Sequence, residues 1–150
     1  MRRLALNPDR FAVADCLVHQ PPIRMVERLL AIDDHRARCA LTVRDNNPFI
    51  DARNELPGWV GVELMAQAIA LFAGYHCLLR DEAVRVGYLL GSRQYSCHTS
   101  AFGVGSELLI EIEQEYHNEG MGLFYCRILH GDTELASARL NTYQAPLSNE

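Results

Sequence analysis

The chain has 150 residues, 49% of them hydrophobic, with 14 basic and 19 acidic side chains and a net charge of −5. This length and hydrophobic content fit one ordinary domain, residues 1–150, with a single core. The acidic balance excludes the basic surface by which proteins hold nucleic acid, so no nucleic-acid partner is expected.

The cysteines and the N-terminus both bear on where the protein works. Its five cysteines are scattered, odd in number and without a C-x-x-C pair, so they indicate neither a disulfide framework nor a zinc site. The N-terminus has no apolar run of signal-peptide length, and we find no stretch long enough to cross a bilayer. The sequence therefore predicts a cytoplasmic protein with no metal and no membrane span.

The first predicted elements are two strands. Apolar residues from Leu29 to Val43 flank an Asp33-Asp34 turn signal, which is typical of strands joined by a tight connection. The segment from Asp45 to Pro48 then interrupts the pattern.

A long apolar helix is predicted over residues 59–79, ended by a charged run at 80–82. Its apolar residues surround it on nearly every side, which is typical of a buried helix. Pro57 suits the first turn, and Gly58 and Gly61 leave the backbone uncovered, so that another group can approach it closely.

Strands follow the helix. Leu108, Ile110 and Ile112 alternate with other residues, two of them glutamates, which predicts a strand with one apolar face. Turn residues at 117–120 and 130–132 precede further strands at 123–129 and 134–143. Because a helix this apolar must be enclosed, we predict an α+β fold in which a curved antiparallel sheet wraps around it. The exposed sheet edge would pair with a second chain.

Glu63 stands out because it is a carboxylate near the start of this apolar helix. Gln67 lies one turn later on the same face. Burial disfavours the charged form of a carboxylate unless a partner or a solvated pocket compensates, so Glu63 is a candidate general acid or base. The alternative is a buried Glu63 that is satisfied by hydrogen bonds to the backbone or to Gln67.

Four segments, in order, resemble the bacterial β-hydroxyacyl-acyl carrier protein dehydratases, which have the hotdog fold. Leu56–Gln67, with the pattern P-G-x-x-G-x-E-x-M-x-Q, resembles the central helix of that family. His19–Arg28 is similar to its H-R-x-P-x-L-L-V-D-R segment, Asn47–Ile50 to its N-x-P-F-F run, and Gly87–Gly91 to the strand after the helix. The branch associated with aryl polyene pigment synthesis is the most similar.

This resemblance implies a dehydratase, a lyase that removes water from a 3-hydroxyacyl thioester, in fatty-acid-like or aryl polyene biosynthesis. Glu63 matches the family's acid-base carboxylate, and Gly58, with Trp59 beside it, matches the backbone donor to the thioester carbonyl. Gln67 would orient Glu63 or a water. The acyl group would arrive on the phosphopantetheine of an acyl carrier protein, so no further cofactor is expected. The resemblance also implies a dimer whose active sites straddle the interface.

The family's catalytic histidine is missing from its usual loop. In the family it belongs to a G-H-F-P-G sequence, whereas the matching segment Ile50–Leu56 holds no histidine. His19 is the candidate replacement base, because its segment lies near the tunnel mouth in the family. The other histidines are assigned to turns (His35, His117, His130), to the far end of the helix (His76) and to a half-buried strand position (His98).

Three functions fit this pattern. The first is a dehydratase, acting as a homodimer with His19 as base or as the carboxylate-bearing chain of a heterodimer whose partner supplies the imidazole. The second is a hotdog acyl thioesterase, in which the helix carboxylate activates water. The third is a non-catalytic acyl-binding subunit. The sequence does not determine the identity or length of the acyl chain.

Docking of an acidic acyl carrier protein on this acidic chain needs a local basic patch. Five arginines flank the segments that carry the resemblance, and we expect them to form it: Arg24, Arg28, Arg80, Arg85 and Arg93.

Overall fold

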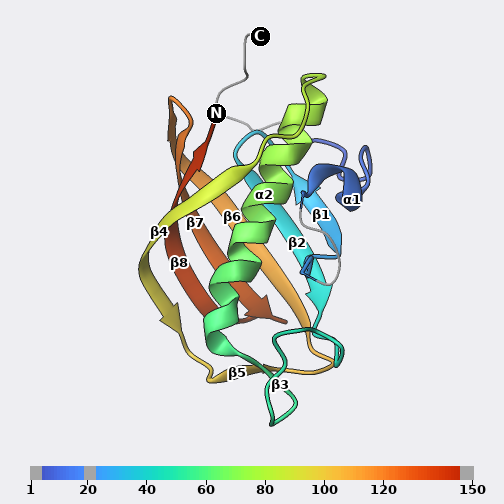
Figure 1. Cartoon of the computed structure of the whole chain (residues 1–150), viewed down its shortest axis with the longest axis vertical. Coiled ribbons are helices and arrows are strands. Elements are labelled where there is room, and N and C mark those ends of the chain that lie inside the picture. Colours follow the sequence, from blue (N-terminus) through green and yellow to red (C-terminus); the bar gives the residue numbers. More distant parts are fainter. Residues whose placement is uncertain (1–4, 19–22, 146–150) are drawn as a thin grey trace.

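The computed structural model of the chain describes residues 5–18 and 23–145. A six-stranded antiparallel sheet curves around one long helix, α2 (Gly61–Leu79) (Figure 1). The strands follow the order β1-β2-β6-β7-β8-β4. Their bounds are β1 (Arg28–Ile32), β2 (Arg36–Thr42), β4 (Gly87–Cys97), β6 (Glu107–Asn118), β7 (Met121–His130) and β8 (Thr133–Gln144). The predicted α+β architecture is confirmed.

The tight turns of the sheet form where the sequence predicts them. Between β6 and β7, Glu119 and Gly120 adopt positive φ angles of 50° and 84°, which give a two-residue turn the twist of its flanking strands. Between β1 and β2, the Asp33 side chain accepts the N–H groups of His35 and Arg36 at 2.8 and 2.7 Å. These local hydrogen bonds and backbone angles fix the register of the hairpins.

The two faces of the sheet differ in character. Leu108, Ile110 and Ile112 of β6 are buried, which confirms the predicted alternation. On the opposite face, Glu111 forms ion pairs with Arg38 at 2.6 Å and with Arg127. The apolar face therefore encloses α2, and the charged face is solvated.

The helix predicted over residues 59–79 begins as a 3-10 turn, η1 (Gly58–Val60), and continues as α2. The structure also contains three short elements that the sequence did not predict: α1 (Val13–Cys16), β3 (Glu55–Pro57) and β5 (Ala101–Gly103). Each spans only three or four residues, too few to show a hydrophobic period. β3 pairs with β5 through Leu56 and Phe102, which are both fully buried. This small sheet places the start of the helical segment.

By length and composition alone, the helical segment Gly58–Leu79 could cross a membrane, and 56% of its most apolar window is buried inside the protein. It is the one such helix among the described residues. The expectation that no stretch reaches spanning length was therefore wrong, because a helix enclosed by its own sheet is as apolar as a membrane helix. Here this helix forms the core of the fold.

α1 packs onto α2 at Gly74. A Cβ on Gly74 would lie less than 3.0 Å from the backbone carbonyl of Cys16, which cannot move without displacing α1. We expect Gly74→Ala to lower the free energy of unfolding by about 1–3 kcal/mol, because overpacking outweighs the better helix propensity of alanine. Urea denaturation measures this change. Gly91→Ala, where no atom lies within 4 Å, is the control, and an unaltered Gly74→Ala midpoint would contradict the contact.

One edge of the sheet is apolar and uncovered within the chain. The edge strand β4 exposes 57% of Tyr88, 42% of Leu89 and 55% of Leu90. An edge strand also presents N–H and C=O groups that can pair with another chain. β4 therefore has the properties of a subunit contact, which agrees with the pairing expected at the sheet edge.

Candidate functional site

The start of the helical segment is held by the segment that joins β4 and β5 and by the end of β4. The Gly58 N–H donates to Ser100 O at 3.0 Å, and the Gly58 carbonyl accepts the Tyr95 hydroxyl at 2.5 Å. A Cβ on Gly58 would lie 2.9 Å from Thr99 O, so only glycine fits at this position. Packing therefore explains the glycine of the P-G pair, in addition to the donor role that the resemblance implies for Gly58.

The donor that the resemblance assigns to Gly58 is already engaged in this chain. Its N–H can reach a substrate oxygen only if Ser100 O releases it. Trp59, the next residue, has 66% of its surface exposed and contacts Phe49 edge to face, with ring centroids 6.0 Å apart. The indole therefore stands at the surface beside the helix start.

Glu63 and Gln67 lie together one turn apart on α2. Gln67 is fully buried, and its Nε2 donates to Glu63 Oε1 at 3.1 Å and to Ile23 O at 2.9 Å. Its Oε1 accepts the N–H groups of Met25 at 2.7 Å and Val26 at 3.3 Å. A glutamine amide can make four such bonds, and all four are present.

Gln67 therefore joins Glu63 to the segment that precedes β1. Because its donors and acceptors are all engaged, binding of substrate by Gln67 would require the loss of one of these bonds. The geometry favours an orienting role toward Glu63 over direct substrate contact. His19, the candidate base, lies outside the described residues, four positions before Ile23.

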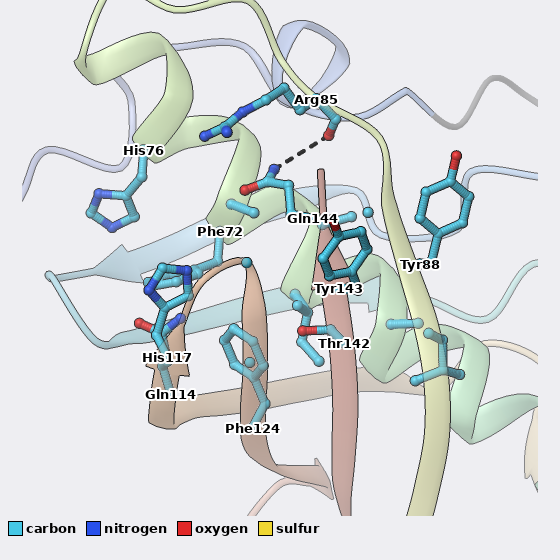
Figure 2. A pocket seen from close by; sticks show the side chains of 18 of the residues that line it. Phe72, His76, Arg85, Tyr88, Gln114, His117, Phe124, Thr142, Tyr143 and Gln144 are labelled. Carbon is cyan, nitrogen blue, oxygen red and sulfur yellow. Dashed lines mark hydrogen bonds between the residues drawn. The ribbon is translucent and has the colours of Figure 1, made fainter. Parts of the chain in front are cut away.

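A cavity of about 490 Å³ extends along α2, between the helix and strands β4, β6, β7 and β8. Glu63 lies at one end of its helical wall, and His76 lies 13 positions later, about 20 Å away at 1.5 Å per residue. Figure 2 shows His76 and Phe72 on the helix side, with His117 and Gln114 of β6 nearby. The cavity has the size of a small-molecule site.

The other described histidines all lie outside the loop at residues 50–56. His35 is exposed in the β1–β2 turn, as predicted. The turn positions predicted for His117 and His130 were wrong: both are exposed strand residues, because β6 and β7 extend further than predicted. His98 is exposed after β4 rather than half-buried, because β4 ends one residue earlier. His76 lines the same cavity as Glu63, which the sequence did not predict, yet the helix separates the two by the distance given above.

The loop that holds the family's histidine has its own local structure here. The Asp51 carboxylate accepts the N–H groups of Arg53 at 2.9 Å and Glu55 at 3.1 Å, and Asn54 adopts a φ of 60°. Residues 51–54 are exposed. The short loop is therefore closed on itself and supplies no imidazole.

Of the five predicted docking arginines, the four with described side chains do not form one patch, and the side chain of Arg93 lies outside the described part of the structure. Arg24 and Arg28 lie just before and at the start of β1, and Arg28 pairs with Glu107. Arg80 and Arg85 follow the far end of α2, and both pair with Glu82, at 3.2 and 3.5 Å. The two pairs therefore flank opposite ends of α2 (Figure 1).

Tyr95 and Gly61 depend on each other at the start of α2. Burial and a hydrogen bond with Cys97 raise the pKa of Tyr95, so its hydroxyl stays a neutral donor to Gly58 O. A Cβ on Gly61 would lie less than 3.0 Å from that hydroxyl. This packing explains the second glycine of the motif.

We expect Gly61→Ala to destabilise the protein by about 1–3 kcal/mol through this clash. In the Tyr95→Phe background the same change should cost less, because the next contacts, Tyr95 Cζ and Ile128 Cδ1, stand at 3.3 and 3.2 Å. A double-mutant cycle of urea midpoints measures the coupling. Additive effects would show that the hydroxyl does not limit the space at Gly61.

Metal binding has no support in the described part of the chain, which contains no group of three or more His, Cys, Asp or Glu side chains that could hold an ion. The fold and the site define a class of protein: a hotdog protein in which a carboxylate of the central helix faces an elongated cavity. Residues 11–150 match the family described as ApeP-like, ApeP dehydratase. The chain belongs to this family.

Solved and curated relatives agree with that assignment. A chain of the dehydratase heterocomplex ApeI:P from Xenorhabdus doucetiae is 36% identical, with a TM-score of 0.86 over 93% of this chain and 94% of that chain. The 3-hydroxyacyl-[acyl-carrier-protein] dehydratase FabZ of Anaeromyxobacter dehalogenans is 32% identical over 88 residues, 55% of this chain and 56% of FabZ. The chain thus spans about half the length of the curated relatives it matches. The PaaI protein of E. coli, 11% identical with a TM-score of 0.60 over 79% of this chain and 78% of PaaI, shares the fold alone.

Proposed function

We propose that this chain is the carboxylate-bearing subunit of a 3-hydroxyacyl-[acyl carrier protein] dehydratase of fatty-acid-like or aryl polyene biosynthesis. One observation carries the proposal: Glu63 lines the cavity of about 490 Å³ and accepts a hydrogen bond from the buried Gln67. Membership of a dehydratase family supports the reaction type.

In the proposed reaction, the α carbon of the thioester loses a proton and the β carbon loses its hydroxyl group. Glu63 would protonate that hydroxyl, so that it leaves as water and an α,β-unsaturated thioester remains. N–H groups of the first helical turn, at Gly58 and Trp59, would stabilise the negative charge that develops on the thioester oxygen, aided by the helix dipole. Gly58 contributes only after Ser100 O releases its N–H.

The base that removes the α proton would come from a second hotdog chain. The loop at residues 50–56 provides no histidine, while β4 presents an apolar edge on which a second chain can pair. The related ApeI:P structure is described as a dehydratase heterocomplex, which supports the pairing of two different chains.

The acyl group would be presented by an acyl carrier protein, whose phosphopantetheine makes a bound cofactor unnecessary. The dehydratase FabZ acts, by its name, on acyl carrier protein substrates, which supports this partner. Work on such a carrier-bound intermediate fits the cytoplasmic location that the sequence predicts.

Mass spectrometry of the carrier-bound product tests the reaction. The protein, alone and with a candidate partner chain, is incubated with a 3-hydroxyacyl carrier protein. Loss of one water from the acyl group supports the dehydratase. Release of free 3-hydroxy acid would show a thioesterase instead, and acyl binding without either product would show a non-catalytic subunit.

A further inference from the structure

The far end of the cavity differs chemically from its middle. Between Glu63 and His76, the helix wall consists of small or apolar residues: Ala66, Ile69, Ala70, Phe72 and Ala73. At the far end the lining becomes polar, with Asp34, His76, Arg80, Arg85, His117 and Gln144. A plain hydrocarbon chain needs no such groups at its end.

The apolar middle indicates which part of a substrate lies there. The phosphopantetheine arm contains two amides, and burial of amides without hydrogen bonds is costly. An acyl chain has no such requirement and suits a wall of alanine, isoleucine and phenylalanine. The distance of about 20 Å from Glu63 to His76 is close to the length of an extended palmitoyl chain.

Arg85 has a guanidinium N–H group at this end that lacks an acceptor among the described residues. Its Nη1 donates to Ala145 O at 3.2 Å, its backbone carbonyl accepts from Gln144 Nε2 at 3.4 Å (Figure 2), and its Nε is buried without an acceptor among the described residues. Buried donors without a partner are rare in native proteins. An oxygen atom delivered by a ligand would relieve this deficit after a small movement of the guanidinium.

The charges at this end nearly cancel. Arg80 and Arg85 are matched by Glu82, with which both pair, and by Asp34. Burial lowers the pKa of His76, whose Nε2 lies 3.0 Å from Asp33 O, so this imidazole is neutral near pH 7. A polar but nearly neutral end suits an uncharged oxygen better than a carboxylate.

We propose that the far end of the cavity is a subsite for the terminal, or ω, end of the acyl chain, where Arg85 and His117 donate hydrogen bonds to an uncharged oxygen such as a hydroxyl. This subsite rests on the proposed function in that it assumes an acyl chain that starts near Glu63. It makes Arg85 and His117 specificity-determining residues for acyl chains that end in a hydroxyl group.

Binding measurements test the subsite without requiring turnover. The full chain is titrated by calorimetry with the pantetheine thioesters of palmitic acid, ω-hydroxypalmitic acid and hexadecanedioic acid. We expect the hydroxyl-ended thioester to bind about three- to tenfold more tightly than the methyl-ended one, the factor that one net hydrogen bond supplies. The carboxylate-ended thioester should bind no better than the hydroxyl-ended one.

Matched variants test which residues cause the preference for the hydroxyl-ended thioester. Arg85→Met should abolish it and His117→Leu, on the exposed end of β6, should reduce it, whereas Arg36→Met at the exposed β1–β2 turn should keep it. Ala70→Phe, which fills the middle of the cavity, should weaken binding of both long thioesters.

Several results would overturn the proposal. The first is equal affinity for the methyl-ended and hydroxyl-ended thioesters. The second is a preference for the hydroxyl-ended thioester that survives both Arg85→Met and His117→Leu. The third is that the carboxylate-ended thioester binds most tightly of the three. Weaker binding of 4′-phosphopantetheine itself in Arg85→Met would assign this end to the carrier arm instead. If the chain prefers the hydroxyl-ended thioester but produces no water, alone or with any partner chain, the subsite is supported and only the proposed dehydratase function is refuted.

Discussion

Dehydration by the reconstituted enzyme should fall by about 100- to 10,000-fold in Glu63→Gln, because a positioned acid-base group contributes roughly that factor. Glutamine keeps the shape of the side chain, and its amide oxygen can still accept the bond from Gln67 Nε2. The fold and the affinity for substrate should therefore remain close to those of the parent. Single-turnover rates of water loss, measured by mass spectrometry, give the size of the effect.

Glu55→Gln on β3 is the matched control, since it removes a carboxylate outside the cavity lining. It should leave the rate close to that of the parent. Equal rates for Glu63→Gln and the parent, in a preparation shown to be active, would refute the role proposed for Glu63.

The second large effect concerns pairing. We expect this chain alone to be nearly inert, His19→Ala to change little, and addition of a hotdog chain with a G-H-F-P-type loop to raise turnover by orders of magnitude. The physical reason is the narrow geometry of an acid-base pair, which tolerates about half an ångström of misplacement and is rarely reproduced by a histidine from another segment. Turnover measured against increasing amounts of the second chain tests this expectation.

Two other outcomes are distinct. If the chain alone dehydrates substrate and His19→Ala abolishes the activity, the chain is a self-sufficient enzyme with His19 as base. Full activity of the chain alone that survives His19→Ala would contradict both the heterodimer hypothesis and the hypothesis that His19 is the base. It would direct attention to His98 or to a mechanism in which Glu63 acts through a water.

The proposed pairing of two chains also bears on where an acyl carrier protein would dock. The structure separates Arg24 and Arg28 from Arg80 and Arg85, and it pairs most of these side chains with glutamates of the same chain. Exposed pairs of this kind contribute little to stability and present little net positive charge. A carrier-docking surface that spans two subunits is consistent with this arrangement.

Much of the site could be found from the sequence because its signals are local. The P-G-x-x-G-x-E-x-M-x-Q pattern places Glu63 and Gln67 one helical turn apart, and the structure joins them by a 3.1 Å hydrogen bond. The turns at Asp33 and at Glu119-Gly120 carry their own hydrogen-bond acceptor or backbone preference. Such features need no knowledge of distant contacts.

Other parts of the site could not be found in this way. The bonds of Gln67 with Ile23, Met25 and Val26 cross more than 40 positions of sequence. The engagement of the Gly58 N–H by Ser100 O likewise depends on how β5 pairs with β3. A sequence pattern shows which residue types are present but not which distant backbone group will meet them.

The sequence by itself determined the enclosed helix, the sheet that wraps it, the carboxylate at the helix start and the absence of a histidine from residues 50–56, because each depends on residue type and period along a continuous segment. Only the tertiary structure decided that Gln67 meets the backbone of Ile23, Met25 and Val26. It also decided that Tyr95 and Ser100 hold the helix start, and that His76, Arg85 and His117 line one cavity. These contacts arise when the sheet curves around α2 and brings segments far apart in the chain to within hydrogen-bond distance, a result of packing that no local pattern contains.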